Sequence, residues 1–92
     1  MFVRWTKPAA NDLTQIGDYT QEHFGAAQAH RAALAIYKAA DSLKNMPYRG
    51  RAGRKPGTRE LALPDFPFVV IYRVGNEAVE IVRVLHGAQQ WP

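Results

Sequence analysis

The C-terminal end of the sequence gathers the side chains best suited to chemistry. Arg83, His86 and Trp91 fall within nine positions, with Gln89 and Gln90 beside the tryptophan. An arginine binds phosphate, a histidine exchanges protons near neutral pH, and an indole offers an aromatic surface for stacking. These residues suit a site that handles a phosphodiester. They also fit a β-strand whose end is covered by a packed tryptophan, so both interpretations stay open.

A second candidate is a basic stretch in the middle of the chain. Residues 49–59 contain no acidic residue and hold five of the 12 Lys and Arg residues: Arg49, Arg51, Arg54, Lys55 and Arg59. Three glycines and one proline disfavour helix and strand here, so we expect a loop. Clustered cations repel one another, which favours a role in binding nucleic acid or another target over a solvated connector.

Composition limits the possible classes of protein. The 92 residues suffice for one domain, residues 1–92, with a single core. No apolar run is long enough to span a membrane and no signal peptide is evident, so we expect a cytoplasmic protein. The absence of cysteine excludes disulfides, and the scattered His23, His30 and His86 do not suggest a metal site. We expect no cofactor, and a net charge of +4 favours a polyanionic or acidic partner.

Two helices are expected in the first half of the chain. The first begins near Pro8, with Thr6 or Lys7 as its cap, and ends at Gly25. Its apolar face comprises Leu13, Ile16, Thr20 and Phe24, and its polar face Asn11, Asp12, Gln15, Asp18 and Glu22. The second helix has an apolar seam of Ala29, Ala33, Ile36, Ala40 and Leu43 and closes at Met46-Pro47. The short break between them predicts an antiparallel helical hairpin.

Strands are expected at residues 2–6, 59–63, 66–74 and 78–86. A two-residue turn at Gly75-Asn76 would pair Tyr72 with Val79, Val70 with Ile81 and Phe68 with Arg83. Arg73 and Glu80 would then be diagonal neighbours. Strand alternation also places Arg83 and His86 on opposite faces of the sheet. Apolar residues occur on both faces, so the helices would leave one face uncovered as a binding surface.

These elements predict an α+β fold with an N-terminal strand and an antiparallel two-helix hairpin packed on a mainly antiparallel three- to four-stranded sheet. The order and spacing of five segments carry a resemblance to a known family: residues 5–13, 43–53, 57–61, 70–74 and 81–87. The chain resembles the RelE/ParE superfamily of bacterial type II toxins over nearly its whole length. The resemblance implies a cytosolic growth inhibitor that a cognate antitoxin protein neutralises.

Two mechanisms occur in that superfamily. ParE-like members poison DNA gyrase through a protein contact, whereas RelE-like members enter the ribosome and cut mRNA. The ending from Arg83 to His86 is closer to ParE-like members. Nucleolytic relatives commonly carry an arginine near the position of Val69, and some have an aromatic residue where this chain has Gly87. The resemblance therefore favours gyrase slightly over the ribosome.

The nuclease interpretation would assign specific roles. His86 would transfer protons, and Arg59 and Arg83 would stabilise charge on the phosphate. Trp91 would stack on a base, while Arg54, Lys55 or Arg59 would replace the cation missing near Val69.

Structural roles are the alternative for the same residues. Arg83 would then hold the tail, His86 would cap the sheet, and Glu60 would pair with Arg59 or another loop cation. A third interpretation of the whole chain is a non-toxic binding module whose basic groove receives an acidic partner.

Overall fold

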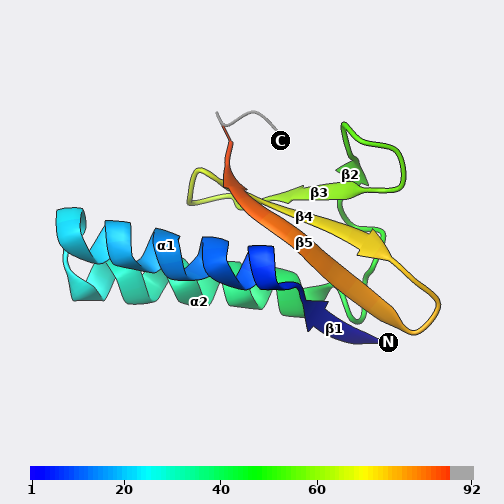
Figure 1. Ribbon diagram of the computed structural model, residues 1–92, viewed down its shortest axis with the longest axis horizontal. Helices are drawn as coiled ribbons and strands as arrows, with labels where there is room; N and C mark the ends of the chain where they lie inside the picture. Colours follow the sequence, from blue (N-terminus) through cyan, green and yellow to red (C-terminus); the bar gives the residue numbers. More distant parts are fainter. Residues whose placement is uncertain (88–92) are drawn as a thin grey trace.

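The chain forms two layers, in which a pair of helices packs on one face of a five-stranded sheet (Figure 1). The computed structural model describes residues 1–87. Its elements are β1 (Phe2–Trp5), α1 (Lys7–Phe24), α2 (Ala26–Ser42), β2 (Arg51–Ala52), β3 (Arg59–Ala62), β4 (Phe68–Val74) and β5 (Ala78–His86). The strand order is β1-β5-β4-β3-β2, with β1 parallel to β5 and the other pairs antiparallel. The predicted fold class is confirmed.

The sheet has one strand more than the prediction allowed. Arg51 and Ala52, placed in a loop by the sequence, pair with Glu60 and Arg59 as the short edge strand β2. The glycines that flank this dipeptide disfavour a long strand, so only these two residues pair with β3.

Local signals set the ends of the helices as expected. Thr6 is the N-cap of α1, and its hydroxyl accepts a hydrogen bond from the Ala9 N–H at 3.3 Å. Pro8 lies in the first turn, where the N–H it lacks would have no partner within the helix. Gly25 ends α1 with φ at +92°, a conformation that side chains other than glycine rarely adopt. Helix α2 starts at the next residue, so the two helices lie antiparallel (Figure 1).

The core lies between the helices and one face of the sheet. Its buried members are Ala9, Ile36, Ala40, Leu43, Leu63, Val70, Tyr72, Val79, Ile81 and Val84. Full burial of a valine, leucine or isoleucine side chain contributes about 1.5–3 kcal/mol to stability. None of the helices in residues 1–87 combines the length and apolar character needed to cross a membrane.

Three details of the predicted helices were wrong. Phe24 is 68% exposed, because the hairpin tip extends beyond the sheet and nothing in the described chain covers it there (Figure 1). Ala32 rather than Ala33 is the buried alanine in the middle of α2. Helix α2 also ends at Ser42, four residues before Met46.

The pairing of β4 with β5 differs from the predicted register. Neither Gly75 nor Asn76 has the positive φ that a type I′ turn requires, and the connection is longer than two residues. The observed partners are Val74 with Val79, Tyr72 with Ile81, Ile71 with Arg83 and Phe68 with His86. A β-bulge between the second and third of these pairs shifts the register by one residue. Arg73 and Glu80 are therefore direct partners and form an ion pair at 3.9 Å.

Candidate target-binding surface

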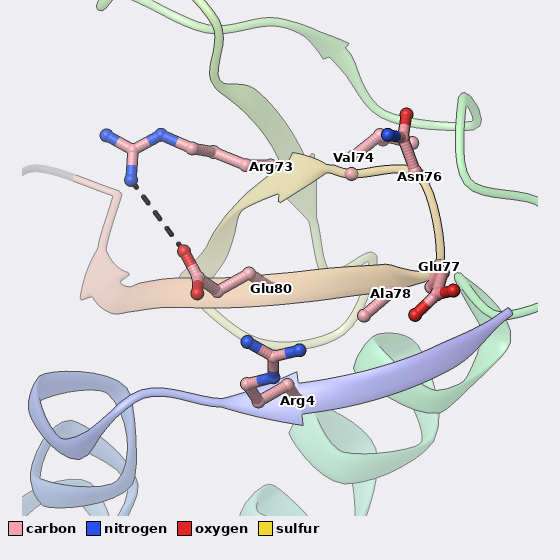
Figure 2. A pocket seen from close by; sticks show the side chains of 8 residues that line it. Arg4, Arg73, Val74, Asn76, Glu77, Ala78 and Glu80 are labelled. Atoms are coloured by element: carbon pink, nitrogen blue, oxygen red, sulfur yellow. Dashed lines mark ion pairs between the residues drawn. The ribbon is translucent and has the colours of Figure 1, made fainter.

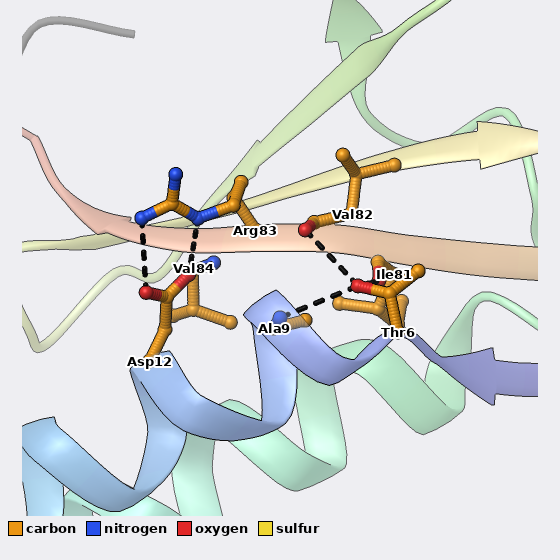
Figure 3. Close-up of polar contacts among 7 residues, drawn as sticks. All are labelled: Thr6, Ala9, Asp12, Ile81, Val82, Arg83 and Val84. Atoms are coloured by element: carbon orange, nitrogen blue, oxygen red, sulfur yellow. Dashed lines mark hydrogen bonds and ion pairs between the residues drawn. The ribbon is translucent and has the colours of Figure 1, made fainter. Parts of the chain in front are cut away.

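A closed cluster of polar contacts joins helix α1 to the edge of β5. Strand β1 pairs with β5 only as far as Ile81, and beyond that point Asp12 takes the place of a neighbouring strand. Its carboxylate accepts hydrogen bonds from Arg83 Nε at 2.7 Å, Arg83 Nη2 at 3.0 Å and the Val84 N–H at 2.9 Å (Figure 3). The Thr6 hydroxyl donates to the Ile81 carbonyl at 2.8 Å. The start of α1 is thereby fixed to β5.

This closed cluster commits the guanidinium of Arg83 to the fold. The side chains of Asp12 and Arg83 are 11% and 26% exposed. A bidentate pair of this kind combines charge with fixed geometry and is among the stronger polar contacts in proteins. The hydrogen bonds to Asp12 outweigh burial and raise the pKa of Arg83 above its ordinary value. Arg83 is thus a fully charged residue, and Asp12 occupies the edge of its guanidinium formed by Nε and Nη2.

An open cluster surrounds Glu60 on β3. Its side chain is 2% exposed and accepts from Arg51 Nη2 at 3.1 Å and from the Arg54 N–H at 3.0 Å, with Arg54 Nε at 3.8 Å. Burial raises the pKa of Glu60, but the Arg54 N–H and the two cations outweigh it, and the pKa lies below its ordinary value. Arg51 and Arg54 stay 69% and 52% exposed, so their charges remain available to a partner.

The basic stretch is an ordered hairpin rather than a loose loop. We name residues 49–60 the basic hairpin. The Gly53 N–H donates to the Thr58 carbonyl at 2.8 Å, and the Thr58 N–H donates to the Lys55 carbonyl at 3.2 Å. Pro56 followed by Gly57 at φ +80° matches a type II β-turn, which needs glycine at its third position. The exposed cations are therefore carried on a defined turn.

Arg59 faces the base of this hairpin. Its guanidinium donates to the Gly50 carbonyl at 2.6 Å and to the Tyr48 carbonyl at 3.2 Å, and it lies over the Tyr48 ring. The hydroxyl of the fully buried Tyr72 accepts from the Gly50 N–H at 2.9 Å. A Cβ at position 50 would lie 2.6 Å from that hydroxyl, so only glycine fits. Arg59 and Tyr72 together hold the chain that enters the basic hairpin.

His86 lies at a small hollow beside the open cluster. The hollow is lined by Arg54, Glu60, Val69, Ile71, Leu85, His86 and Gly87 and has a volume of about 10 Å³. That is the room of about one water molecule and too little for a phosphate group. The His86 ring also meets the Phe68 ring edge to face at 6.1 Å between centroids. The structure thus brings Arg54 and His86 to one place, as the nuclease interpretation requires, without a preformed substrate pocket.

A larger concavity lies at the other end of the β4–β5 hairpin. It has a volume of about 490 Å³ and is lined by Arg4, Arg73 and Glu80 together with the turn at residues 74–78 (Figure 2). Arg4 pairs with Glu80 in the strand ladder, and Glu80 pairs with Arg73. With Glu77, the lining holds two arginines and two glutamates. Its charges balance, so it does not attract an anion strongly.

The net charge belongs to one layer of the molecule. Residues 7–44, which include both helices, carry four basic and four acidic residues. The net charge of +4 therefore comes from the sheet and its connections, and the basic hairpin is its main source. Figure 1 places that hairpin at the opposite end of the molecule from the tip of the helices.

This arrangement of helices, sheet and basic hairpin agrees with a known protein family. The model of the ParE toxin of type II toxin–antitoxin systems, parDE, matches residues 3–91. The chain belongs to this ParE toxin family. It is a toxin of a type II toxin–antitoxin system.

Relatives and solved structures agree with the family. Putative toxin Y4kP of Sinorhizobium fredii is 42% identical over 98% of this chain and 92% of that protein. Toxin RelE2 of Caulobacter vibrioides is 40% identical over 95% of this chain and 96% of that protein.

Among solved structures, the chromosomal ParDE system of P. aeruginosa is similar with a TM-score of 0.87 and 31% identity. The match covers 94% of this chain and 95% of that one. The RelBE2 toxin–antitoxin complex of Mycobacterium tuberculosis follows with a TM-score of 0.68 and 25% identity, over 92% and 95% of the two chains. Both ParE and RelE names occur among these proteins, so similarity alone does not choose the target.

The predicted site residues of this ParE-family toxin separate into two groups. Arg51, Arg54 and His86 gather around Glu60 and the hollow beside it. Arg83 faces Asp12, and Arg59 faces the carbonyls of Tyr48 and Gly50. Of the remaining binding candidates, Arg49 donates to the Ser42 hydroxyl at 2.8 Å, and the Lys55 carbonyl accepts in the turn. Trp91 lies outside the described residues.

Glu60 pairs with two loop cations, as one interpretation of the sequence expected, but they are Arg51 and Arg54 rather than Arg59. The face of the sheet away from the helices is also less open than predicted. Ile71 is only 2% exposed and Leu85 only 5%.

Asp12 is the residue that the sequence placed wrongly. It was assigned to the polar, outward side of the first helix, yet it is buried. It stands three residues after the buried Ala9 and four before Ile16, so it shares their face of the helix. That spacing was the signal available in the sequence, because an acid in phase with an apolar face needs a buried partner.

Proposed function

We propose that this ParE-family toxin poisons DNA gyrase through a protein contact, and that a cognate antitoxin neutralises it in the cytoplasm. The observation that carries the proposal is the closed cluster. A phosphate would either have to use the N–H groups of Arg83 that Asp12 does not occupy, or displace a bidentate carboxylate that also holds the Val84 N–H. Leaving that carboxylate buried without its cation would be strongly unfavourable. Arg83 is therefore suited to holding the fold.

Two further observations support action without nuclease chemistry. Arg59 donates its guanidinium hydrogen bonds to backbone carbonyls. These contacts position the basic hairpin and leave the guanidinium directed at the backbone and not at a substrate phosphate. The hollow at His86 holds about 10 Å³, so no phosphate clamp is preformed there. Transition-state stabilisation depends on donors placed in advance around the developing charge. The similarity to the ParDE system of P. aeruginosa supports both the ParE-like action and an antitoxin partner.

Ribosome-dependent mRNA cleavage is the second candidate. The shared location of Arg54 and His86 favours it, because a cation and a proton-exchanging group then lie together beside Val69. A relative that is 40% identical carries the name Toxin RelE2. This mechanism would need the hollow to open when RNA binds. Arg54 and His86 would be its working residues, without Arg83.

Purified toxin can be tested in two parallel reactions. In the first, gyrase, ATP and plasmid DNA are incubated with toxin, and trapped double-strand breaks are measured after denaturation. In the second, toxin is added to a translating ribosome system and the mRNA is mapped for cuts. We expect breaks in the first reaction and none of the cuts in the second. Cuts in the ribosomal A site without gyrase-dependent breaks would overturn the proposal.

A further inference from the structure

The basic hairpin carries more positive charge than the fold uses. Residues 49–60 hold five basic residues and a single acidic residue, Glu60, which contacts both Arg51 and Arg54. Those two side chains remain more than half exposed, and Lys55 stands next to them at the turn. Elsewhere the charges balance, both on the helices and around the concavity at Arg4 and Arg73. An anionic partner would therefore meet this protein at the basic hairpin.

The shape of the hairpin indicates the kind of anion. Its exposed cations stand on a rigid type II turn at the edge of the sheet, and residues 54–57 are all exposed. Figure 1 shows this turn projecting from the sheet, away from both helices. A projecting basic turn can reach into a groove of duplex DNA, where phosphates line both sides. An acidic peptide would instead be favoured by a basic concavity, and the large concavity here is balanced in charge.

We propose that the basic hairpin binds the phosphate backbone of duplex DNA, so that the toxin recognises its target with DNA bound. This inference rests on the proposed action on gyrase, an enzyme that holds duplex DNA while it works. Arg54 and Lys55 make the phosphate contacts at the turn. Glu60 keeps the turn in place by accepting from the Arg54 N–H, which leaves the arginine side chain able to reach outward.

The test compares two double variants of equal charge change. R54Q/K55Q removes the two cations at the turn, and R31Q/K38Q removes two exposed cations on α2 as the matched control. Each purified toxin, without gyrase, is titrated into a short fluorescent DNA duplex over a series of salt concentrations, and anisotropy is recorded. Loss of two phosphate contacts lowers the slope of log affinity against log salt by about 1.8. We expect that loss, with at least tenfold weaker binding, for R54Q/K55Q alone.

Each outcome bears on the inference separately from the proposed function. Equal DNA binding by the two double variants would overturn the inference, even if wild-type toxin traps gyrase breaks as proposed. A wild-type toxin that traps no breaks would overturn the gyrase proposal and leave the DNA-binding result to stand alone. Weaker antitoxin binding by R54Q/K55Q with unchanged DNA binding would show a protein site and overturn the inference. Thermal unfolding checks the fold of each variant, and R49Q/K55Q replaces R54Q/K55Q if the latter unfolds.

Discussion

Two buried carboxylates, Asp12 and Glu60, hold arginines in opposite ways. Glu60 belongs to a row of strand partners that runs Arg51, Glu60, Ile71, Arg83 across four strands, and Asp12 on α1 contacts the last member of that row. At the closed cluster, Asp12 accepts from both Nε and Nη2 of a largely shielded Arg83. At the open cluster, Glu60 takes a backbone N–H and only part of two exposed guanidinium groups.

The difference teaches which arginines are free to act on a partner. Burial of both members of an ion pair makes the pair part of the fold, because neither charge can leave its counter-ion without a large penalty. An exposed cation beside a buried acid stays in contact with solvent and is held only weakly by that acid. A second anion can therefore bind the same cation. From this comparison we propose that Arg83 is structural, whereas Arg51 and Arg54 serve in binding. The predictions below test each side of it.

The largest expected effect is at the closed cluster. Asp12→Ala leaves Arg83 without its counter-ion and the Val84 N–H without an acceptor, and it should lower the free energy of unfolding by about 2–4 kcal/mol. Urea unfolding followed by circular dichroism measures the loss. Asp18→Ala, on an exposed part of the same helix, is the control and should change stability by less than about 0.5 kcal/mol. Equal losses of stability from the two substitutions would show that the closed cluster does not stabilise the fold.

A smaller loss is expected at the open cluster. Glu60→Gln keeps the shape of the side chain and one acceptor oxygen but removes the charge that Arg51 and the Arg54 N–H use. Stability should fall by about 1–2 kcal/mol at neutral pH. Glu77→Gln, on an exposed turn, serves as the matched control. A Glu60→Gln loss larger than that of Asp12→Ala would reverse the ranking of the two clusters.

The pH dependence of stability provides a separate test of Glu60. Because its pKa in the fold is lowered from the ordinary value of 4.5, the unfolded chain takes up the proton more readily. The stabilising contribution is complete above that ordinary value and is lost as pH falls through the lower pKa of the folded protein. Melting temperatures from pH 7 down to pH 3 should therefore decline more steeply for wild type than for Glu60→Gln. Parallel curves would contradict the assigned role.

The smallest stability effect is expected for Arg54→Gln. The Arg54 N–H, which makes the shorter contact with Glu60, is retained, and the exposed guanidinium adds little to folding. The free energy of unfolding should change by less than about 0.5 kcal/mol. Arg83→Gln should cost several times more, because it removes the partner of a shielded carboxylate. Comparable losses from the two arginines would show that both clusters are equally structural.

The sequence predicted what local chemistry determines. Thr6, Pro8 and Gly25 mark the ends of helix α1 because caps, proline and positive φ act within a few residues. Asp12 and Arg83 are 71 residues apart, so their contact depends on how the layers pack. The bulge near Arg83 is likewise marked by no glycine or proline within β5. The basic stretch was recognised from charge alone, but its type II turn needed the positive φ of Gly57.

The most direct test of the central claim replaces the closed ion pair by a neutral one. Asp12→Asn and Arg83→Gln in the same chain keep hydrogen-bonding groups at both positions and remove both charges. Toxin activity is then measured as growth inhibition and as gyrase-trapped DNA breaks, per folded molecule, at a temperature where the double variant stays folded. If Arg83 only holds the fold, activity should stay within about twofold of wild type. A folded double variant that loses about 100-fold or more, the loss expected for a group that stabilises reacting charge, would contradict the account.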